Sequence, residues 1–523
     1  MKHTFKKILS LALTLSMVCS MAACGSKPSE ASSGAAASSG APVAAAPAPA
    51  DKSNLVISLP GEPSTLDPYA HSLYYGFIPA TLVFETLIEK GADGEYKPKL
   101  ATEWSFEDDT TLNVTLREGV TFSNGNTFTA ADVKHTLALA SASSFSGTLF
   151  ACIDNEKTTV VDDTHIQIKL KYAYAPLLDV LASYRAGIID QETYEAAGAD
   201  AFGRAPIGTG PMKLTNWVSG DRIEFATNES YWGEAVAYST CVFRVVLESS
   251  SRTIELETKG VDIAVDIPFS DWSRVESDPN MKLVNGQTTV LASLVFNNSL
   301  ELFQDVRVRQ ALAHGLDLEA LVKTCWEGTA DVADSYYAKA LLGYKSKGPM
   351  AYDVEKAKAL LAEAGYPNGF DLTYTTYQTT LNQTFAEVLQ AMWAKIGVNL
   401  KVDIVDLATF TSMNNGGQLT AALMTPSVAI ADPSAALILF PINRTISLRH
   451  NDQHIQDLLD KGASTYNNDE RTAIYGELQD YLFEKTYTVP VAYTKFAFGT
   501  QSYVSGFDFV PSQVPDLTKV RFN

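Results

Sequence analysis

The chain has 523 residues and a mass of 56.6 kDa, which is too long for one hydrophobic core and predicts two or more lobes. Hydrophobic residues make up 46% and charged residues 19% of the sequence, so wholesale disorder is excluded. The 60 acidic residues outnumber the 40 basic ones, and the net charge of −20 argues against a nucleic-acid partner. Five cysteines do not make a disulfide framework in a chain of this length, and we expect free thiols.

Residues 1–23 have the pattern of an export signal. Three lysines precede an apolar run from Ile8 to Val18 that is too short to span a bilayer. The segment Met21-Ala22-Ala23-Cys24 follows and resembles a bacterial lipobox, which implies cleavage before Cys24 and a lipid on its sulfur. The alternative is an ordinary secretory signal with an accidental cysteine.

Residues 24–53 are expected to form a flexible linker. From Ser26 to Ala50 the sequence is almost entirely serine, alanine, glycine and proline, and it cannot bury enough apolar side chain to offset the entropy of ordering. We interpret it as a tether between a membrane anchor and a folded domain.

Short strands and amphipathic helices alternate along the rest of the chain. Apolar residues predict a strand over 55–59, and alternation predicts another over 112–116 that continues over 120–122 into a tight turn at Asn124-Gly125. Thr129 should cap a helix, with Asp132 completing a capping box.

Later elements are marked by clearer end signals. Asp353 should cap a helix that ends at Gly365, and a second helix around 385–392 should end at Gly397. A strand of alternating apolar residues follows over 398–405. Helix followed by strand predicts a mixed α/β or α+β lobe.

The order of local motifs resembles the peptide/nickel class of extracytoplasmic solute-binding proteins, the receptors of ABC importers. The likeness runs from about residue 55 to the C-terminus. Its motifs include, in order, Ser64-Thr65-Leu66-Asp67-Pro68, Leu116-Arg117-Glu118-Gly119-Val120, Pro206-Ile207-Gly208-Thr209-Gly210-Pro211, Asn228-Glu229-Ser230-Tyr231-Trp232-Gly233 and Val306-Arg307-Val308-Arg309-Gln310-Ala311-Leu312. One such motif would be weak, whereas an ordered series predicts membership in the class.

The resemblance implies a mixed α/β fold of the periplasmic-binding-protein type, with two lobes around a cleft. The expected boundaries are lobe I at 54–288 and 493–523, an inserted subdomain at roughly 95–200, and lobe II at 289–492. The first lobe would thus be discontinuous. Apolar extended runs near 290–296 and 489–493 would cross between the lobes and form a two-segment hinge.

The resemblance also indicates ligand-binding residues. His71, Tyr74 and Tyr75 follow the opening motif, where family members approach the cleft. Arg185 stands in a stretch of small residues that often faces the ligand, and an arginine there could bind a carboxylate through two parallel hydrogen bonds. Each of these four could instead be a surface or inter-lobe residue.

Asp432 is the candidate partner of a peptide's amino group. Many peptide-binding members carry a tryptophan and an aspartate near an Asp-Pro pair here, and a buried ammonium needs a carboxylate. This chain keeps Asp432-Pro433 but lacks the tryptophan. Two roles therefore stay open for Asp432, the ammonium ligand and the structural acid of the turn.

Metal and enzyme signatures are weak. His450 and His454 have the spacing of helical metal ligands, but no defined set of further ligands accompanies them, so no metal and no cofactor are expected. The sequence has no nucleophile elbow, phosphate-binding loop or dinucleotide fingerprint.

Together these observations predict a receptor and not an enzyme. It would capture a short peptide or peptide-like solute and deliver it to an ABC permease driven by a separate ATPase. We expect a monomer on the extracytoplasmic face of the cell membrane, held there by the lipid on Cys24. The alternatives are a receptor for a nickel-chelator or glutathione-like solute and, from another class, a secreted hydrolase.

Overall fold

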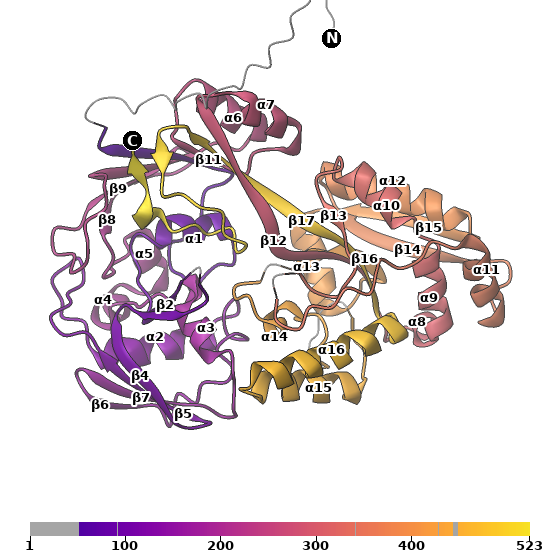
Figure 1. Cartoon of the computed structure of the whole chain (residues 1–523), viewed down its shortest axis with the longest axis horizontal. Helices are drawn as coiled ribbons and strands as arrows, with labels where there is room; N and C mark the ends of the chain where they lie inside the picture. The colour runs from indigo at the N-terminus through magenta and orange to yellow at the C-terminus, as the bar shows by residue number, and fades with distance from the viewer. Residues whose placement is uncertain (1–51, 92, 340, 427, 443–447) are drawn as a thin grey trace, which may run out of the picture. The chain divides into compact units, whose positions relative to one another are not determined.

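The structure is a computed structural model that describes residues 52–91, 93–339, 341–426, 428–442 and 448–523 (Figure 1). The expected signal peptide, Cys24 and nearly all of the expected linker lie outside the described residues. Within the described ranges, no helix is both long and apolar enough to cross a membrane.

A large mixed sheet has the strand order β16-β12-β17-β11-β1-β10-β9-β8, with β13 paired to β17. Its strand β1 confirms the strand predicted over 55–59 and runs parallel to β10 and β11, whereas the other neighbours are antiparallel. Its strands are β1 (Asn54–Leu59), β8 (Met212–Val218), β9 (Arg222–Thr227), β10 (Thr240–Val245), β11 (Ile263–Val265), β12 (Met281–Phe296), β13 (Asp331–Val332), β16 (Ala421–Met424) and β17 (Thr488–Gln501).

The long strands β12 and β17 lie side by side in one antiparallel ladder, from Met281 opposite Gln501 to Val295 opposite Thr488 (Figure 1). Met281 packs in a small core with Ala497, whereas Leu294 belongs to a different and larger core. The two runs expected to cross between lobes are therefore paired with each other, and each strand serves more than one core. Their use as a hinge stays a prediction.

A four-stranded antiparallel sheet, β4-β5-β7-β6, lies within the region 101–169, beside α2 (Ala130–Ala142). Its strands are β4 (Ala101–Asp108), β5 (Thr111–Leu116), β6 (Thr159–Asp162) and β7 (His165–Lys169). Strand β5 confirms the predicted alternation, and Thr129 and Asp132 form the predicted capping box.

The predicted continuation of this strand over 120–122 is wrong. Gly119 has φ +74°, which turns the chain, and only an isolated bridge between Thr121 and Thr127 follows. The predicted turn at Asn124-Gly125 is present, because Gly125 has φ +94° and its amide donates to the carbonyl of Phe122.

The region after residue 350 confirms the clearer sequence signals. Asp353 caps α11 (Val354–Glu363), and Gly365 has φ +94° just beyond its end. Helix α12 (Thr380–Ala394) leads through Gly397 into β15 (Val398–Val405), which pairs in parallel with β14 (Phe370–Tyr377).

The remaining strands and α-helices are as follows. The remaining strands are β2 (Ile88–Lys90), β3 (Tyr96–Pro98), β18 (Val504–Ser505) and β19 (Arg521–Phe522). The remaining helices are α1 (Tyr74–Ala80), α3 (Leu177–Ala182), α4 (Gln191–Ala197), α5 (Ala199–Arg204), α6 (Ser249–Glu257), α7 (Trp272–Ser277), α8 (Glu301–Gln304), α9 (Val306–His314), α10 (Leu318–Cys325), α13 (Leu407–Gly416), α14 (Pro433–Ala436), α15 (Gln453–Ser464) and α16 (Asn468–Lys485).

Three large hydrophobic clusters form the cores of the described residues. The first collects side chains from β1, α1, α2 and β10, the second collects α9, α10 and α12 around β14, and the third joins α15 and α16 to Tyr336 and Phe440. Ile430 packs in the first core, although Leu437 and Leu439 belong to the third. The segment around Asp432 therefore lies where two cores meet. Cys152, Cys241 and Cys325 are free thiols, as expected.

Candidate functional site

Two glycines position the aromatic residues at the start of α1. A Cβ atom at Gly76 would lie 2.7 Å from Cε1 of His71, and one at Gly61 would lie 2.9 Å from the hydroxyl oxygen of Tyr75. The missing side chains let both rings pack against backbone, which a larger residue would prevent. The residues that the sequence predicts after the opening motif are thus held close to α1.

Arg185 joins the same group from a distant part of the sequence. It lies in the short 3₁₀ helix Tyr184–Ala186, and its guanidinium carbon is 4.7 Å from the ring centre of Phe77 and 5.6 Å from that of Tyr184. The centre of the His71 ring lies 4.3 Å from that of Phe77. His71 and Arg185, predicted separately, therefore share one aromatic wall.

His71 is held in its neutral form. The side chain is 3% exposed, and burial, followed by the nearby charge of Arg185, lowers its pKa from 6.5 to about 4, with the backbone of Leu73 acting in the opposite direction. The backbone of Leu73 is close enough to act on the imidazole, but neither ring nitrogen has a well-formed hydrogen bond among the described residues. At neutral pH the imidazole can donate one N–H and accept at the other nitrogen.

Tyr74 leads from this group to an aspartate that the sequence reasoning missed. Its ring meets those of Tyr75 and Phe496 edge-on, each at 5.4 Å between centres. Burial, and then the charge of Asp266, raises the pKa of Tyr74. Asp266 directly follows β11, and an acidic residue after a buried strand was the signal available in the sequence.

Asp266 is held in an unusual conformation. Its φ is +62°, which is uncommon outside glycine, and such strain gathers at functional sites. The side chain is 45% exposed, yet the surrounding protein raises its pKa, against the effect of Arg252, whose Nη2 lies 3.3 Å away. Arg252 also donates to the backbone carbonyls of Val246, Val265 and Asp266. The Asp266 carboxylate is therefore half-exposed and fixed in position by its contact with Arg252.

His71, Tyr74, Tyr75 and Arg185 are called the α1 group below. Asp432 has a partner outside this group. One nitrogen of Arg471 contacts both of its carboxylate oxygens, at 2.8 and 3.0 Å, and both side chains are nearly fully buried. Asp432 also caps α14 by accepting from the amide and hydroxyl of Ser434. Both contacts belong to the structural role that the sequence left open. Its contact with a ligand stays a prediction.

The two histidines considered as metal ligands have other surroundings. His450 is buried, and its Nε2 contacts the carbonyl of Phe440 while its ring stacks on Tyr487. His454 lies near the start of α15, half-exposed and 4.0 Å from Glu477. Among the described residues, no group of three or more His, Cys, Asp or Glu side chains could hold a metal ion.

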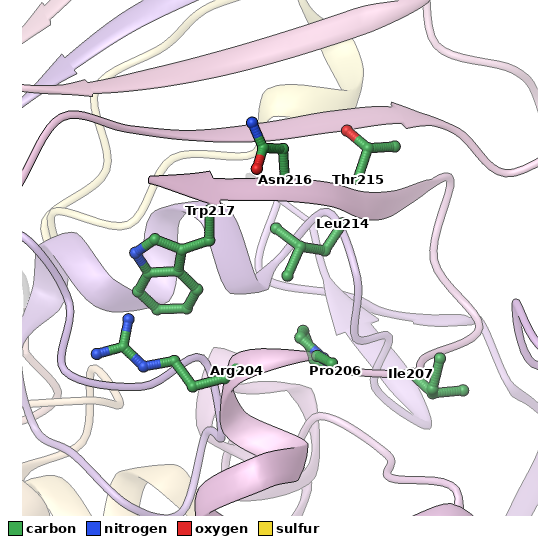
Figure 2. A pocket seen from close by; sticks show the side chains of 8 residues that line it. Arg204, Pro206, Ile207, Leu214, Thr215, Asn216 and Trp217 are labelled. Atoms are coloured by element: carbon green, nitrogen blue, oxygen red, sulfur yellow. The ribbon is translucent and has the colours of Figure 1, made fainter. Parts of the chain in front are cut away.

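A surface pocket of about 430 Å³ lies between α5 and β8 (Figure 2). Arg204 and Trp217 face each other across it, with 4.1 Å between the guanidinium carbon and the ring centre. Glu62 fixes the indole by accepting from Nε1 of Trp217 at 2.8 Å. None of the predicted ligand-binding residues lines this pocket, and its polar side chains already bond to Glu62 or Glu224.

The family model described as bacterial extracellular solute-binding proteins, family 5 Middle, matches residues 95–446. The chain belongs to this family, which confirms the resemblance to the peptide/nickel class.

Relatives and solved structures match along most of the chain. The glutathione-binding protein GsiB of Salmonella typhimurium is 27% identical over 484 residues, 90% of this chain and 94% of the relative. The periplasmic binding protein DppA of Helicobacter pylori, in complex with the peptide STSA, is 25% identical with a TM-score of 0.79 over 90% of this chain and 98% of the other. AgaA of A. tumefaciens R10, in complex with agropinic acid, is 27% identical with a TM-score of 0.79 over 90% and 99%. These structures confirm the predicted mixed α/β, two-lobed fold class.

Proposed function

We propose that this solute-binding protein captures a short peptide or peptide-like solute between its lobes and delivers it to an ABC permease powered by a separate ATPase. The observation that carries the proposal is the α1 group. It places hydrogen-bonding rings (His71, Tyr74, Tyr75), a buried cation (Arg185) and a half-exposed carboxylate (Asp266) on neighbouring segments of one lobe. Such a mixture suits a solute that carries an ammonium, a carboxylate and polar backbone groups.

The proposed lobes follow the predicted boundaries, 54–288 with 493–523 and 289–492, with an inserted subdomain at roughly 95–200. The ladder of β12 and β17 supports this division, because it is the longest strand pair and contributes to separate cores. Its register shifts between Gln287 and Leu291 and between Ala292 and Ser293. Irregular pairing at that point suits a hinge.

Asp432 is one of two candidate residues for binding the ammonium group of a peptide in the proposed site. An ammonium would have to share a carboxylate that already bonds to Arg471 and Ser434. The half-exposed Asp266 has one side-chain ion pair, at 3.3 Å, and offers a second carboxylate for the same task. The affinities of Asp266→Asn and Asp432→Asn for peptides with free and with blocked N-termini distinguish these candidates. The aspartate that binds the ammonium group is the one whose substitution weakens only the free peptides.

The decisive experiment is native mass spectrometry of the purified protein, followed by calorimetry with peptides, glutathione and nickel–chelator complexes. A receptor should retain or bind an intact solute. Consumption of the solute on incubation would instead support the secreted hydrolase. Binding of the metal complex alone would support the nickel-chelator alternative and remove the peptide from the proposal.

Anchoring through Cys24, the extracytoplasmic location and the monomeric state are further parts of the proposal. The support for the anchor is the segment Met21-Ala22-Ala23-Cys24 before a linker rich in small residues. Cys24→Ala should move the protein from the membrane fraction to the soluble fraction. A variant that stays as firmly bound as the parent would show that the lipobox interpretation is wrong.

A further inference from the structure

Two hydrogen bonds join the end of α15 to the proposed inserted subdomain. The amide of Ala175 donates to the carbonyl of Ala463 at 2.8 Å, and the hydroxyl of Tyr466 donates to the carbonyl of Asp109 at 2.9 Å. Figure 1 shows the end of α15 beside the loops of the four-stranded sheet. Both bonds therefore join segments that are far apart in the sequence and that belong to different proposed lobes.

The two acceptors are backbone carbonyls that need a donor from elsewhere in the chain. Ala463 lies in the last turn of α15, which ends at Ser464, and the last four carbonyls of an α-helix have no amide partner in their own helix. Asp109 lies in the turn between β4 and β5, outside the ladder that pairs the two strands. Water can satisfy both carbonyls when these segments separate, so each bond adds only modestly to stability and is reversible.

The aromatic rings at this contact lie outside the hydrophobic cores. Phe106 and Tyr466 meet edge-on with 5.7 Å between ring centres, and they are 37% and 41% exposed. Neither ring belongs to a hydrophobic cluster of the described residues. The contact buries little apolar area, so it can open and close without unfolding a core.

A third contact continues from Ala175 toward the Asp432 segment. Burial raises the pKa of Tyr174, against the effect of its hydrogen bond with the side chain of Ser434. Ser434 in turn donates to Asp432 through its amide and its hydroxyl. The contacts between the proposed lobes thus extend from the exposed ring of Tyr466 to the place where two cores meet.

We propose that a latch holds the two proposed lobes together before any solute is bound. Its members are Phe106, Asp109 and Ala175 on one side and Ala463 and Tyr466 on the other. The inference rests on the lobe closure in the proposed function and adds a control on it.

The latch acts on solute binding through the population of the closed form. Each of its contacts joins one part of the protein to another, so it lowers the free energy of the closed form whether or not a solute is present. A larger fraction of the binding-competent form lowers the apparent Kd. A solute that is enclosed between the lobes leaves only after they separate, so the latch also slows its release.

Hydrogen–deuterium exchange of the solute-free full chain tests the latch directly. The amide of Ala175 exchanges only when its bond to Ala463 is broken. Tyr466→Phe removes one hydrogen bond and keeps the ring, so the peptide that contains Ala175 should exchange about fivefold faster. Tyr466→Ala also removes the ring contact and should accelerate this exchange at least about tenfold.

Tyr352→Phe is the matched control. Tyr352 is 42% exposed, and its hydroxyl has one hydrogen bond, from Lys395, away from the latch. This variant should leave the exchange of the peptide that contains Ala175 unchanged. The buried strand β1 is the internal reference, and its amides should exchange at the parent rate in all three variants.

Two results would overturn the latch. One is exchange at the parent rate in Tyr466→Ala, which would show that the contact does not hold the segments together. The other is equal acceleration of β1 and of the peptide that contains Ala175, which would make Tyr466 a scaffold residue of the whole fold.

Dissociation rates separate the latch from the proposed function. The probes are the peptide Ser-Thr-Ser-Ala and glutathione, and Tyr466→Ala should release a probe that the parent binds at least about tenfold faster. Accelerated exchange without binding of either probe would support the latch and count against the peptide-like solute. Probes that bind the parent and leave Tyr466→Ala at the parent rate, with unchanged exchange, would overturn the latch and leave the receptor.

Discussion

Replacing Asp432 by asparagine removes one buried charge and little else. Asparagine caps a helix about as well as aspartate, so the bond from the amide of Ser434 should survive. Arg471, which is 5% exposed, loses its anionic partner. Removing one member of a buried pair typically costs about 3–5 kcal/mol. Because the amide oxygen remains as an acceptor, we expect the lower end, about 3 kcal/mol.

Thermal unfolding of a matched series measures this cost. For a chain of this length the unfolding entropy is roughly 1 kcal/mol/K, so Asp432→Asn should lower Tm by about 3 °C. Asp432→Ala also removes the cap and should lower Tm by about 4 °C. The double variant Asp432→Asn with Arg471→Met removes both charges. We expect it to lose less than the sum of the two single losses.

Two results would refute this reasoning. One is an unchanged Tm in Asp432→Asn, and the other is a double variant whose loss equals the sum of the single losses. Peptide titrations add a separate readout. A scaffold role predicts similar affinity changes for free and N-acetylated peptides, whereas an ammonium ligand predicts a loss of at least about thirtyfold for free peptides alone.

Three further measurements follow from the α1 group and the paired strands. The pKa of His71 is about 4 in the folded chain against an ordinary 6.5, so the unfolded chain takes up the proton first as the pH falls. The free energy of unfolding should therefore decrease by about 3 kcal/mol between pH 6.5 and pH 4. Urea titrations of His71→Phe should show a much smaller decrease over the same range. Gly76→Ala should cost about 1–3 kcal/mol through its contact with His71, whereas Gly476→Ala, in open space on α16, should gain about 0.5–1 kcal/mol; equal effects in the same titration would contradict the packing argument. A solute at a hundredfold excess over its Kd should stabilise the protein by about 2.7 kcal/mol, and tight binding without a decrease in the radius of gyration by X-ray scattering would reject the hinge.

Local patterns in the sequence predicted the local elements of the fold. The capping box at Thr129 and Asp132, the cap at Asp353 and the glycines 365 and 397 are read from neighbouring residues, and the structure has each of them. Strand β12 was expected only over its apolar half, because the stretch from 281 to 289 carries polar residues and does not alternate cleanly. The strand predicted over 120–122 was wrong because the apolar residues Val120 and Phe122 fit the alternation of a strand, although the chain turns at Gly119.

The candidate site depended more on the resemblance and on distant contacts. His71 and Arg185 were named separately, but they are 114 positions apart, and nothing in either neighbourhood predicts that they share Phe77. Arg471 is likewise 39 positions from Asp432, so its ion pair was not foreseen. Asp266 follows a buried strand, a position that any loop aspartate can occupy.

The surroundings of the four buried arginines of the described residues differ. Arg252, Arg309 and Arg471 are residues of the same type and similar burial as Arg185, and a sequence gives no means of ranking them. Arg252, Arg309 and Arg471 each donate to several carbonyl or carboxylate oxygens, whereas Arg185 lies mainly against the rings of Phe77 and Tyr184. An arginine that donates to several buried acceptors contributes to stability, because its removal leaves those acceptors unsatisfied. Buried polar groups that lack hydrogen-bond partners are expected mainly where function requires them. Comparing the hydrogen bonds of buried residues of the same type within one fold is a way to find such groups.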